Sequence, residues 1–114
     1  MTTLRDKILA ADDLKPIPIK IPEWGVDAFI RPLDGEARFL ISHLPDLGNK
    51  GKNAYILEGY VCLGLVDKDG VPIFALDDRA LLARKSPAVI ERIYQKIIEA
   101  SGIDDKTGDD AEKK

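Results

Sequence analysis

The sequence predicts an α+β fold, a mainly helical single domain of residues 1–103 with an N-terminal β-hairpin. Three patterns support this prediction. Apolar residues recur at helical spacing between residues 65 and 102, and they alternate as in strands between residues 14 and 31. Residues 104–114 hold five acids, three lysines and almost nothing apolar. Such a segment cannot offset the entropy lost on ordering, so we expect a disordered acidic C-terminal tail.

Length and composition restrict the class of protein. A chain of 114 residues with 45% hydrophobic and 32% charged residues is typical of one globular domain. Its net charge of −3 argues against a nucleic-acid partner. The single cysteine, Cys62, suits a reducing cytoplasm, and no apolar run is long enough to span a membrane. Charged residues stand at positions 5–7, where a signal peptide would have its apolar core. We therefore expect a soluble intracellular protein without membrane or nucleic-acid partners.

A short helix is predicted to begin after Thr2 or Thr3, either of which suits the N-cap position, and to run to about Ala11. Leu4, Ile8 and Ala11 share one face of this helix. Because a helix of this length is marginal on its own in water, it needs another surface to pack against.

Residues 14–22 are predicted to form an edge strand. Ile17, Ile19 and Ile21 alternate with prolines and a lysine, and a proline cannot donate a hydrogen bond to a sheet. A turn and the returning strand of a hairpin follow in residues 23–31. The apolar face of this hairpin must lie on helices, because an isolated hairpin is only marginally stable.

Two central helices are predicted next. Asp34 is expected to cap the first, which ends near Leu44 because a proline follows. Asn53 is expected to cap the second, which runs to about Leu65. Its apolar residues lie on two faces, which predicts burial on two sides, either in the core or against another subunit. Its glycines leave open whether residues 61–66 end as a strand.

A polar turn is predicted at residues 67–70, starting either a small second hairpin or an irregular loop. Asp77 is then expected to cap a short helix of residues 78–85. The residues expected to face inward from this helix are Ala80, Leu81 and Leu82.

The clearest helix is predicted over residues 87–101. Ser86 suits its N-cap, Pro87 its first position, and Gly102 a left-handed stop. Six apolar residues fall on one face: Val89, Ile90, Ile93, Tyr94, Ile97 and Ile98.

No catalytic, cofactor or metal site is predicted. Gly51-Lys52 lacks both the earlier glycine and the following Ser or Thr of a phosphate-binding loop. Residues 67–70 resemble the start of a calcium loop, but Pro72 stands where that loop needs glycine. One histidine, His43, and one thiol, Cys62, cannot build the usual zinc cage.

Several apolar side chains are candidates for contact with a protein partner, since such a surface is apolar and rimmed by charge. Trp24, at the hairpin tip, is either a core residue or an exposed binding anchor, and the sequence favours neither. The candidates are Trp24, Ile17, Ile19, Tyr55, Tyr60 and Tyr94.

The order and spacing of these segments resemble those of the tail assembly chaperones of long-tailed bacteriophages. The matching segments are the Leu14-Lys15-Pro16-Ile17-Pro18-Ile19 entry to Pro22-Glu23-Trp24-Gly25, Arg31-Pro32-Leu33, Glu36-Ala37-Arg38, residues 65–74 as the strongest part, Asp77-Asp78, Lys85-Ser86-Pro87-Ala88 and Ser101-Gly102-Ile103. No single segment is diagnostic, and none carries a catalytic motif.

The resemblance implies a non-enzymatic chaperone that needs no cofactor and self-associates as a homo-oligomer. It would bind the tape measure protein and keep it soluble until tail tube subunits polymerise, with the tail tube protein as a second candidate partner. It would act in the host cell cytoplasm and be absent from the mature virion. Family members are often also made in a longer, frameshifted form, which a slippery codon run at Lys113-Lys114 would suit.

Two other functions compete with this one. The first is a structural minor tail component of the virion. The second is a small enzyme or nucleotide-binding regulator, against which the failed phosphate loop and the lack of an acid–base constellation argue.

Overall fold

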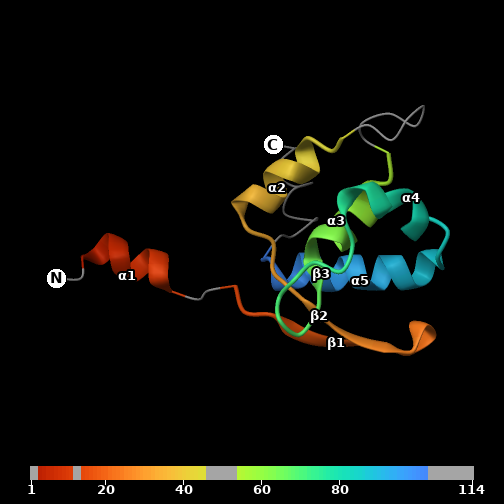
Figure 1. Ribbon diagram of the computed structural model, residues 1–114, viewed down its shortest axis with the longest axis horizontal. Helices are drawn as coiled ribbons and strands as arrows, with labels where there is room; N and C mark the ends of the chain where they lie inside the picture. Colours follow the sequence, from red (N-terminus) through yellow and green to blue (C-terminus); the bar gives the residue numbers. More distant parts are fainter. Residues whose placement is uncertain (1–2, 12–13, 46–53, 103–114) are drawn as a thin grey trace, which may run out of the picture.

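The computed structural model describes residues 3–11, 14–45 and 54–102 and shows helices packed around a small sheet (Figure 1). This confirms the predicted α+β class with its N-terminal hairpin. The elements are α1 (Leu4–Ala10), β1 (Ile17–Ile21), a 3₁₀ turn (Pro22–Trp24), β2 (Val26–Ile30), α2 (Gly35–Ser42), α3 (Ile56–Gly64), β3 (Leu65–Val66), a second 3₁₀ turn (Leu76–Asp78), α4 (Arg79–Leu82) and α5 (Pro87–Ala100). The predicted tail of residues 104–114, with Lys113-Lys114, and the Asn53 cap lie outside the described residues.

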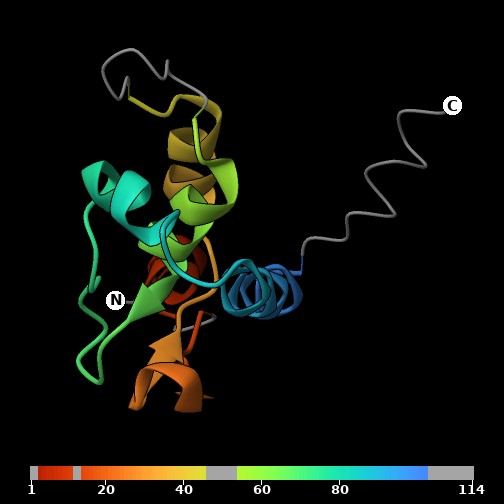
Figure 2. The same cartoon turned by 90° about the vertical axis from the view of Figure 1, so that its right-hand side faces the viewer.

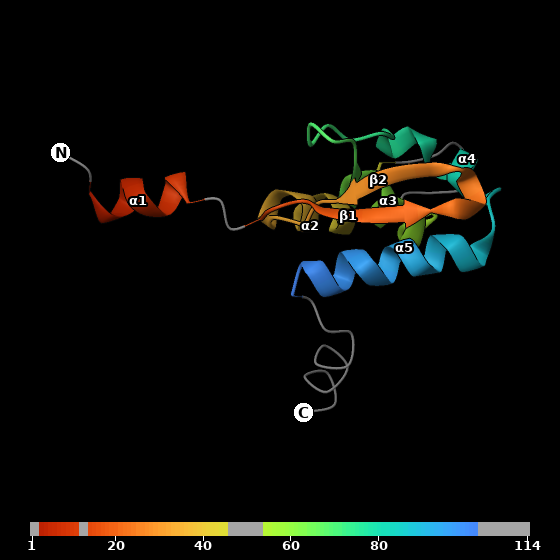
Figure 3. The ribbon, with the colours of Figure 1, turned by 90° about the horizontal axis from the view of Figure 1, so that it is seen from below.

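The sheet is antiparallel, with strand order β1-β2-β3, so β1 is an edge strand as its prolines predicted. Ile17 pairs with Ile30, and Ile21 pairs with Val26 across the hairpin. The odd residues of β1 therefore lie on the same face as the even residues of β2. Helix α5 runs along the hairpin and contacts β2, whose Ile30 is buried (Figure 3).

Helix α5 begins and ends where the sequence predicted, with Pro87 at its first position and Gly102 at a φ of +71° after it. The Ser86 side chain, however, makes no capping hydrogen bond. Five of the six residues on its predicted apolar face are buried, and Tyr94 is half-buried: the buried ones are Val89, Ile90, Ile93, Ile97 and Ile98. Figure 2 looks along α5 and shows it beside the hairpin and α3.

Helix α3 contacts α5, α4 and α2 and buries Val61 and Cys62. It begins at Ile56, after Tyr55 at a left-handed φ of +59°. At its other end the chain passes directly into β3, so the end of the predicted apolar stretch is a short strand. The face with Val61 and Cys62 is buried as expected, whereas on the second apolar face Tyr60 and Leu63 are half-buried and Ile56 is 43% exposed, so burial on two sides is only partial.

The turn after β3 is closed by Asp67, whose Oδ1 accepts hydrogen bonds from the backbone N–H of Asp69 at 2.8 Å and of Val71 at 3.0 Å. Val66 forms an antiparallel bridge with Pro72 beyond the turn. The alternative of a small hairpin at this turn is therefore confirmed.

The short helix that follows differs from its prediction. Asp77 does not cap it; instead the Asp78 carboxylate accepts a hydrogen bond from the Ala75 N–H at 3.0 Å and closes a 3₁₀ turn. Helix α4 then covers only one turn, and the face that it buries is the one with Arg79 and Leu82.

As a result, Ala80 and Leu81, expected inside, are exposed, and Leu82 alone of the three is buried. Arg79 is buried in their place. Its guanidinium donates hydrogen bonds to the carbonyl oxygens of Ala54 and Leu76, both at 2.9 Å, and to that of Pro45. These carbonyls supply the polar partners that a buried cation requires.

Helix α1 forms as predicted and is capped by Thr3, whose Oγ1 accepts from the Asp6 N–H at 3.1 Å. It projects away from the other elements (Figure 1). No residue of α1 is buried against the rest of the described chain, so the structure does not supply the packing surface that the sequence predicts this helix needs.

Candidate interaction surface

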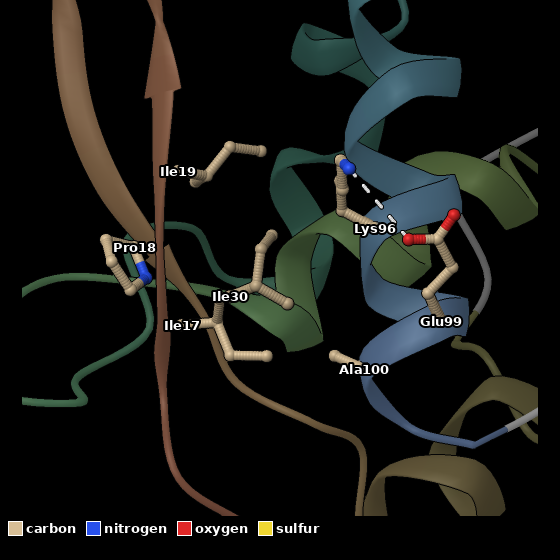
Figure 4. A pocket seen from close by; sticks show the side chains of 7 residues that line it. All are labelled: Ile17, Pro18, Ile19, Ile30, Lys96, Glu99 and Ala100. Atoms are coloured by element: carbon tan, nitrogen blue, oxygen red, sulfur yellow. Dashed lines mark ion pairs between the residues drawn. The ribbon is translucent and has the colours of Figure 1, made fainter.

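An open groove of about 340 Å³ lies between the edge strand β1 and the C-terminal half of α5 (Figure 4). On the face of β1 turned towards α5, Ile21 is buried, whereas Ile19 is half-buried and Ile17 exposed, so this face is uncovered towards the N-terminal end of the strand. The groove is lined by Ile17, Pro18, Ile19, Ile30, Lys96, Glu99 and Ala100.

The groove is apolar at its floor and charged at one rim. Ile30 is buried and Ile19 half-buried, whereas Ile17 keeps 48% of its surface exposed. At the rim, Lys96 Nζ and Glu99 Oε2 form an exposed ion pair at 3.9 Å (Figure 4). Such a groove suits the apolar side chains of a protein segment, with charges at its edge that select orientation.

The free edge of β1 is a poor template for another strand. Pro16 and Pro18 have no N–H to donate, and Lys20 adds a charge further along the same strand. Strand addition depends on main-chain hydrogen bonds, so these residues disfavour it. The groove is therefore better suited to side chains projecting from a helix than to an added strand.

An ion pair with two hydrogen bonds joins the hairpin to α5, the two elements that form the sides of the groove. The guanidinium of Arg92 donates to both carboxylate oxygens of Glu23, at 2.6 and 2.8 Å. These hydrogen bonds lower the pKa of Glu23 from its usual 4.5 to about 2. The planar fork of arginine makes this geometry directional.

The structure brings together only two of the six residues predicted to bind a partner. Ile17 and Ile19 share the groove. Tyr60 and Tyr94 meet each other edge to face, with ring centroids 5.0 Å apart, and so join α3 to α5. Their contact with a partner stays a prediction.

The remaining two candidates lie elsewhere. Trp24 lies in the first 3₁₀ turn, where it is half-buried and packs against the hydrophobic core. It is thus neither a fully buried core residue nor a fully exposed anchor. Tyr55, also half-buried, precedes α3. The α5 side of the groove was not predicted from the sequence. Lys96 and Glu99 lie on the polar face of this helix, where charged side chains normally indicate exposure to solvent.

The described residues offer little for metal or thiol chemistry. Within them, no three His, Cys, Asp or Glu side chains gather into a group that would hold a metal ion. Burial, with a smaller contribution from the charge of Asp78, raises the pKa of the Cys62 thiol to about 12. His43 stacks on Phe39 with ring centroids 4.2 Å apart. None of the helices in the described ranges has the length and apolar character needed to cross a bilayer.

The fold of this chain is similar to that of a protein of known structure. No family model and no curated protein matches the sequence. Among solved structures, the chain is similar to the tail assembly chaperone of bacteriophage HK97, with a TM-score of 0.61 and 21% sequence identity. The match covers 88% of this chain and 95% of the other. The resemblance seen in the sequence is thus matched in three dimensions: this chain has the fold of the HK97 tail assembly chaperone.

Proposed function

We propose that this protein is a tail assembly chaperone of a long-tailed bacteriophage. It self-associates and binds the tape measure protein, keeping it soluble until the tail tube polymerises around it. It acts without catalysis or cofactor in the host cell cytoplasm and is absent from the mature virion. The observation that carries the proposal is the fold shared with the HK97 chaperone along nearly the whole length of both chains.

The surface of the protein supports a binding role. A protein that keeps an apolar partner soluble must expose apolar side chains and remain soluble itself. Large apolar side chains are exposed on several elements, and the chain carries a net charge of −3. The exposed ones are Leu4, Ile8, Leu9, Ile17, Val26, Phe39, Ile56, Val71, Ile73 and Leu81.

Co-expression with the tape measure protein encoded nearby tests the proposal. We expect the two to co-elute as a large soluble complex in size-exclusion chromatography with light scattering. The tape measure protein expressed alone is the control and should be insoluble. A tape measure protein that aggregates equally in both cases would contradict the proposal.

Mass spectrometry of purified phage particles tests whether the protein is absent from the mature virion. We expect the protein in infected-cell lysates and not in finished particles. Its presence in particles at a fixed stoichiometry would instead identify a structural minor tail component.

A further inference from the structure

Helix α1 exposes apolar side chains that its own chain does not cover. Leu4, Ile8 and Leu9 are 73%, 64% and 67% exposed, although Leu4 and Ile8 lie one turn apart on the same face. A helix of seven residues is marginal in water even with a capping box. Burial of this face would stabilise α1.

The groove between β1 and α5 has the matching properties. Its floor is apolar, and the prolines of β1 disfavour filling it by strand addition, which leaves a helix as the suitable occupant. Charge is also complementary. Arg5 and Lys7 outnumber Asp6 and give α1 a net charge of +1, so the rest of a chain of net charge −3 carries −4. At the rim, Glu99 forms an exposed ion pair with Lys96, so the lining itself is neutral and the attraction for α1 comes from the net charge of the rest of the chain.

In this structure α1 lies away from its own groove. Residues 11–16 join α1 to Ile17, which itself lines the groove, and span at most about 20 Å when extended. Pro16 and Pro18 favour extended backbone in the residues that precede them. In Figure 3, α1 lies beyond the N-terminal end of β1, outward from the hairpin and α5. This position presents α1 to a neighbouring molecule.

We propose that α1 of one copy docks its apolar face, made by Leu4 and Ile8, in the β1–α5 groove of a second copy. The inference rests on the self-association included in the proposed function, and it names the contact responsible. If two copies each dock α1 in the groove of the other, they form a closed dimer. If each copy instead docks α1 in the groove of the next, a longer assembly forms.

Charge substitutions on the two sides of the contact test the proposal. Ile8→Asp changes α1 and Ile17→Asp changes the groove, both at exposed positions. In size-exclusion chromatography with light scattering, the unaltered protein should form an oligomer and both variants should approach the monomer mass of 12.6 kDa. Leu81→Asp, at a 62% exposed position on α4, is the matched control and should assemble normally. Circular dichroism confirms that each variant is folded.

A monomeric unaltered protein would overturn the inference. So would oligomers that survive Ile8→Asp and Ile17→Asp, or that are lost equally with Leu81→Asp.

Disulfide trapping distinguishes exchange between copies from folding back within one chain. An Ile8→Cys chain mixed with a differently tagged Ala100→Cys chain should give a dimer containing both chains, reversible by reductant. A chain carrying both substitutions that forms only an internal disulfide, with no mixed dimer, would show docking within one chain and contradict the proposal.

Failure of this inference and failure of the proposed function are separable. A tape measure protein that remains insoluble while trapping succeeds would remove the chaperone function and leave the helix exchange intact. If the protein co-elutes with the tape measure protein but no mixed disulfide dimer forms, the chaperone function stands and the helix exchange is excluded.

Discussion

A Cβ atom placed on Gly64 would lie 2.7 Å from Cδ1 of Ile97, and 2.8 and 2.9 Å from two further carbons of the same side chain. Ile97 is fully buried, so its branched side chain has little room to move. The end of α3 therefore lies so close to α5 that only glycine, which has no side chain, fits at position 64. At the same place, the Gly64 carbonyl accepts a hydrogen bond from the Arg31 N–H at 2.8 Å, which ties this junction to the end of β2.

We expect Gly64→Ala to lower the free energy of unfolding by about 1–3 kcal/mol, the usual cost of overpacking a core. Chemical denaturation of the two proteins measures this difference. Gly59→Ala, in the same helix, is the matched control. Its Cβ would meet Leu44 and Arg79 at 3.4–3.5 Å, which is ordinary contact. Because alanine favours helix, that variant should be neutral or slightly more stable. Equal destabilisation by both substitutions would contradict the close approach.

Replacing Arg79 by methionine should destabilise the protein by about 3 kcal/mol or more. The change removes a buried guanidinium that donates to carbonyl oxygens on both sides of residues 46–53, at Pro45 and Ala54, and to Leu76. Thermal and urea unfolding measure the loss.

Arg84→Met is the matched control, because Arg84 is exposed, and its effect should stay within about 0.5 kcal/mol. Arg79→Lys should rescue little, because one ammonium does not reproduce the fork of donors. Full stability of the lysine variant would show that charge alone suffices.

The ion pair of Glu23 with Arg92 should make stability depend on acid pH. The folded protein lowers the pKa of Glu23 from 4.5 to about 2, so the folded state binds its proton less readily than the unfolded state does. The stabilisation is therefore complete above about pH 4.5 and is lost as the pH falls towards 2. Thermal unfolding of the unaltered protein and of Glu23→Gln should differ at pH 6 and converge near pH 2. A difference that is constant with pH would contradict this linkage.

Cys62 should be unreactive in the folded protein. Its side chain is buried and its thiol pKa is raised to about 12, so the nucleophilic thiolate is scarce at neutral pH. We expect labelling by a thiol reagent to be slow at pH 8 and to accelerate in denaturant. Leu81→Cys, which adds an exposed thiol, should give one fast-reacting equivalent and leave one slow. Two fast equivalents in that variant would show that Cys62 is accessible.

The sequence alone determined the elements whose signals are local. The six-residue apolar face of α5, with Pro87 and Gly102 at its ends, follows from helical spacing and from backbone preferences of those two residues. The edge position of β1 follows from prolines that cannot donate hydrogen bonds. These effects act over a few residues, so the sequence contains them directly.

Only the tertiary structure decided what those elements bury and what they leave open. Leu81 was predicted to face inward, yet it is exposed, and Arg79 is buried because carbonyl oxygens of Pro45 and Ala54, distant in sequence, accept hydrogen bonds from its guanidinium. The groove likewise joins β1 to residues nearly eighty positions later in α5. Apolar spacing identifies a face of a helix or strand, but whether that face is covered depends on the direction in which other elements approach it, which is set by packing across the whole chain.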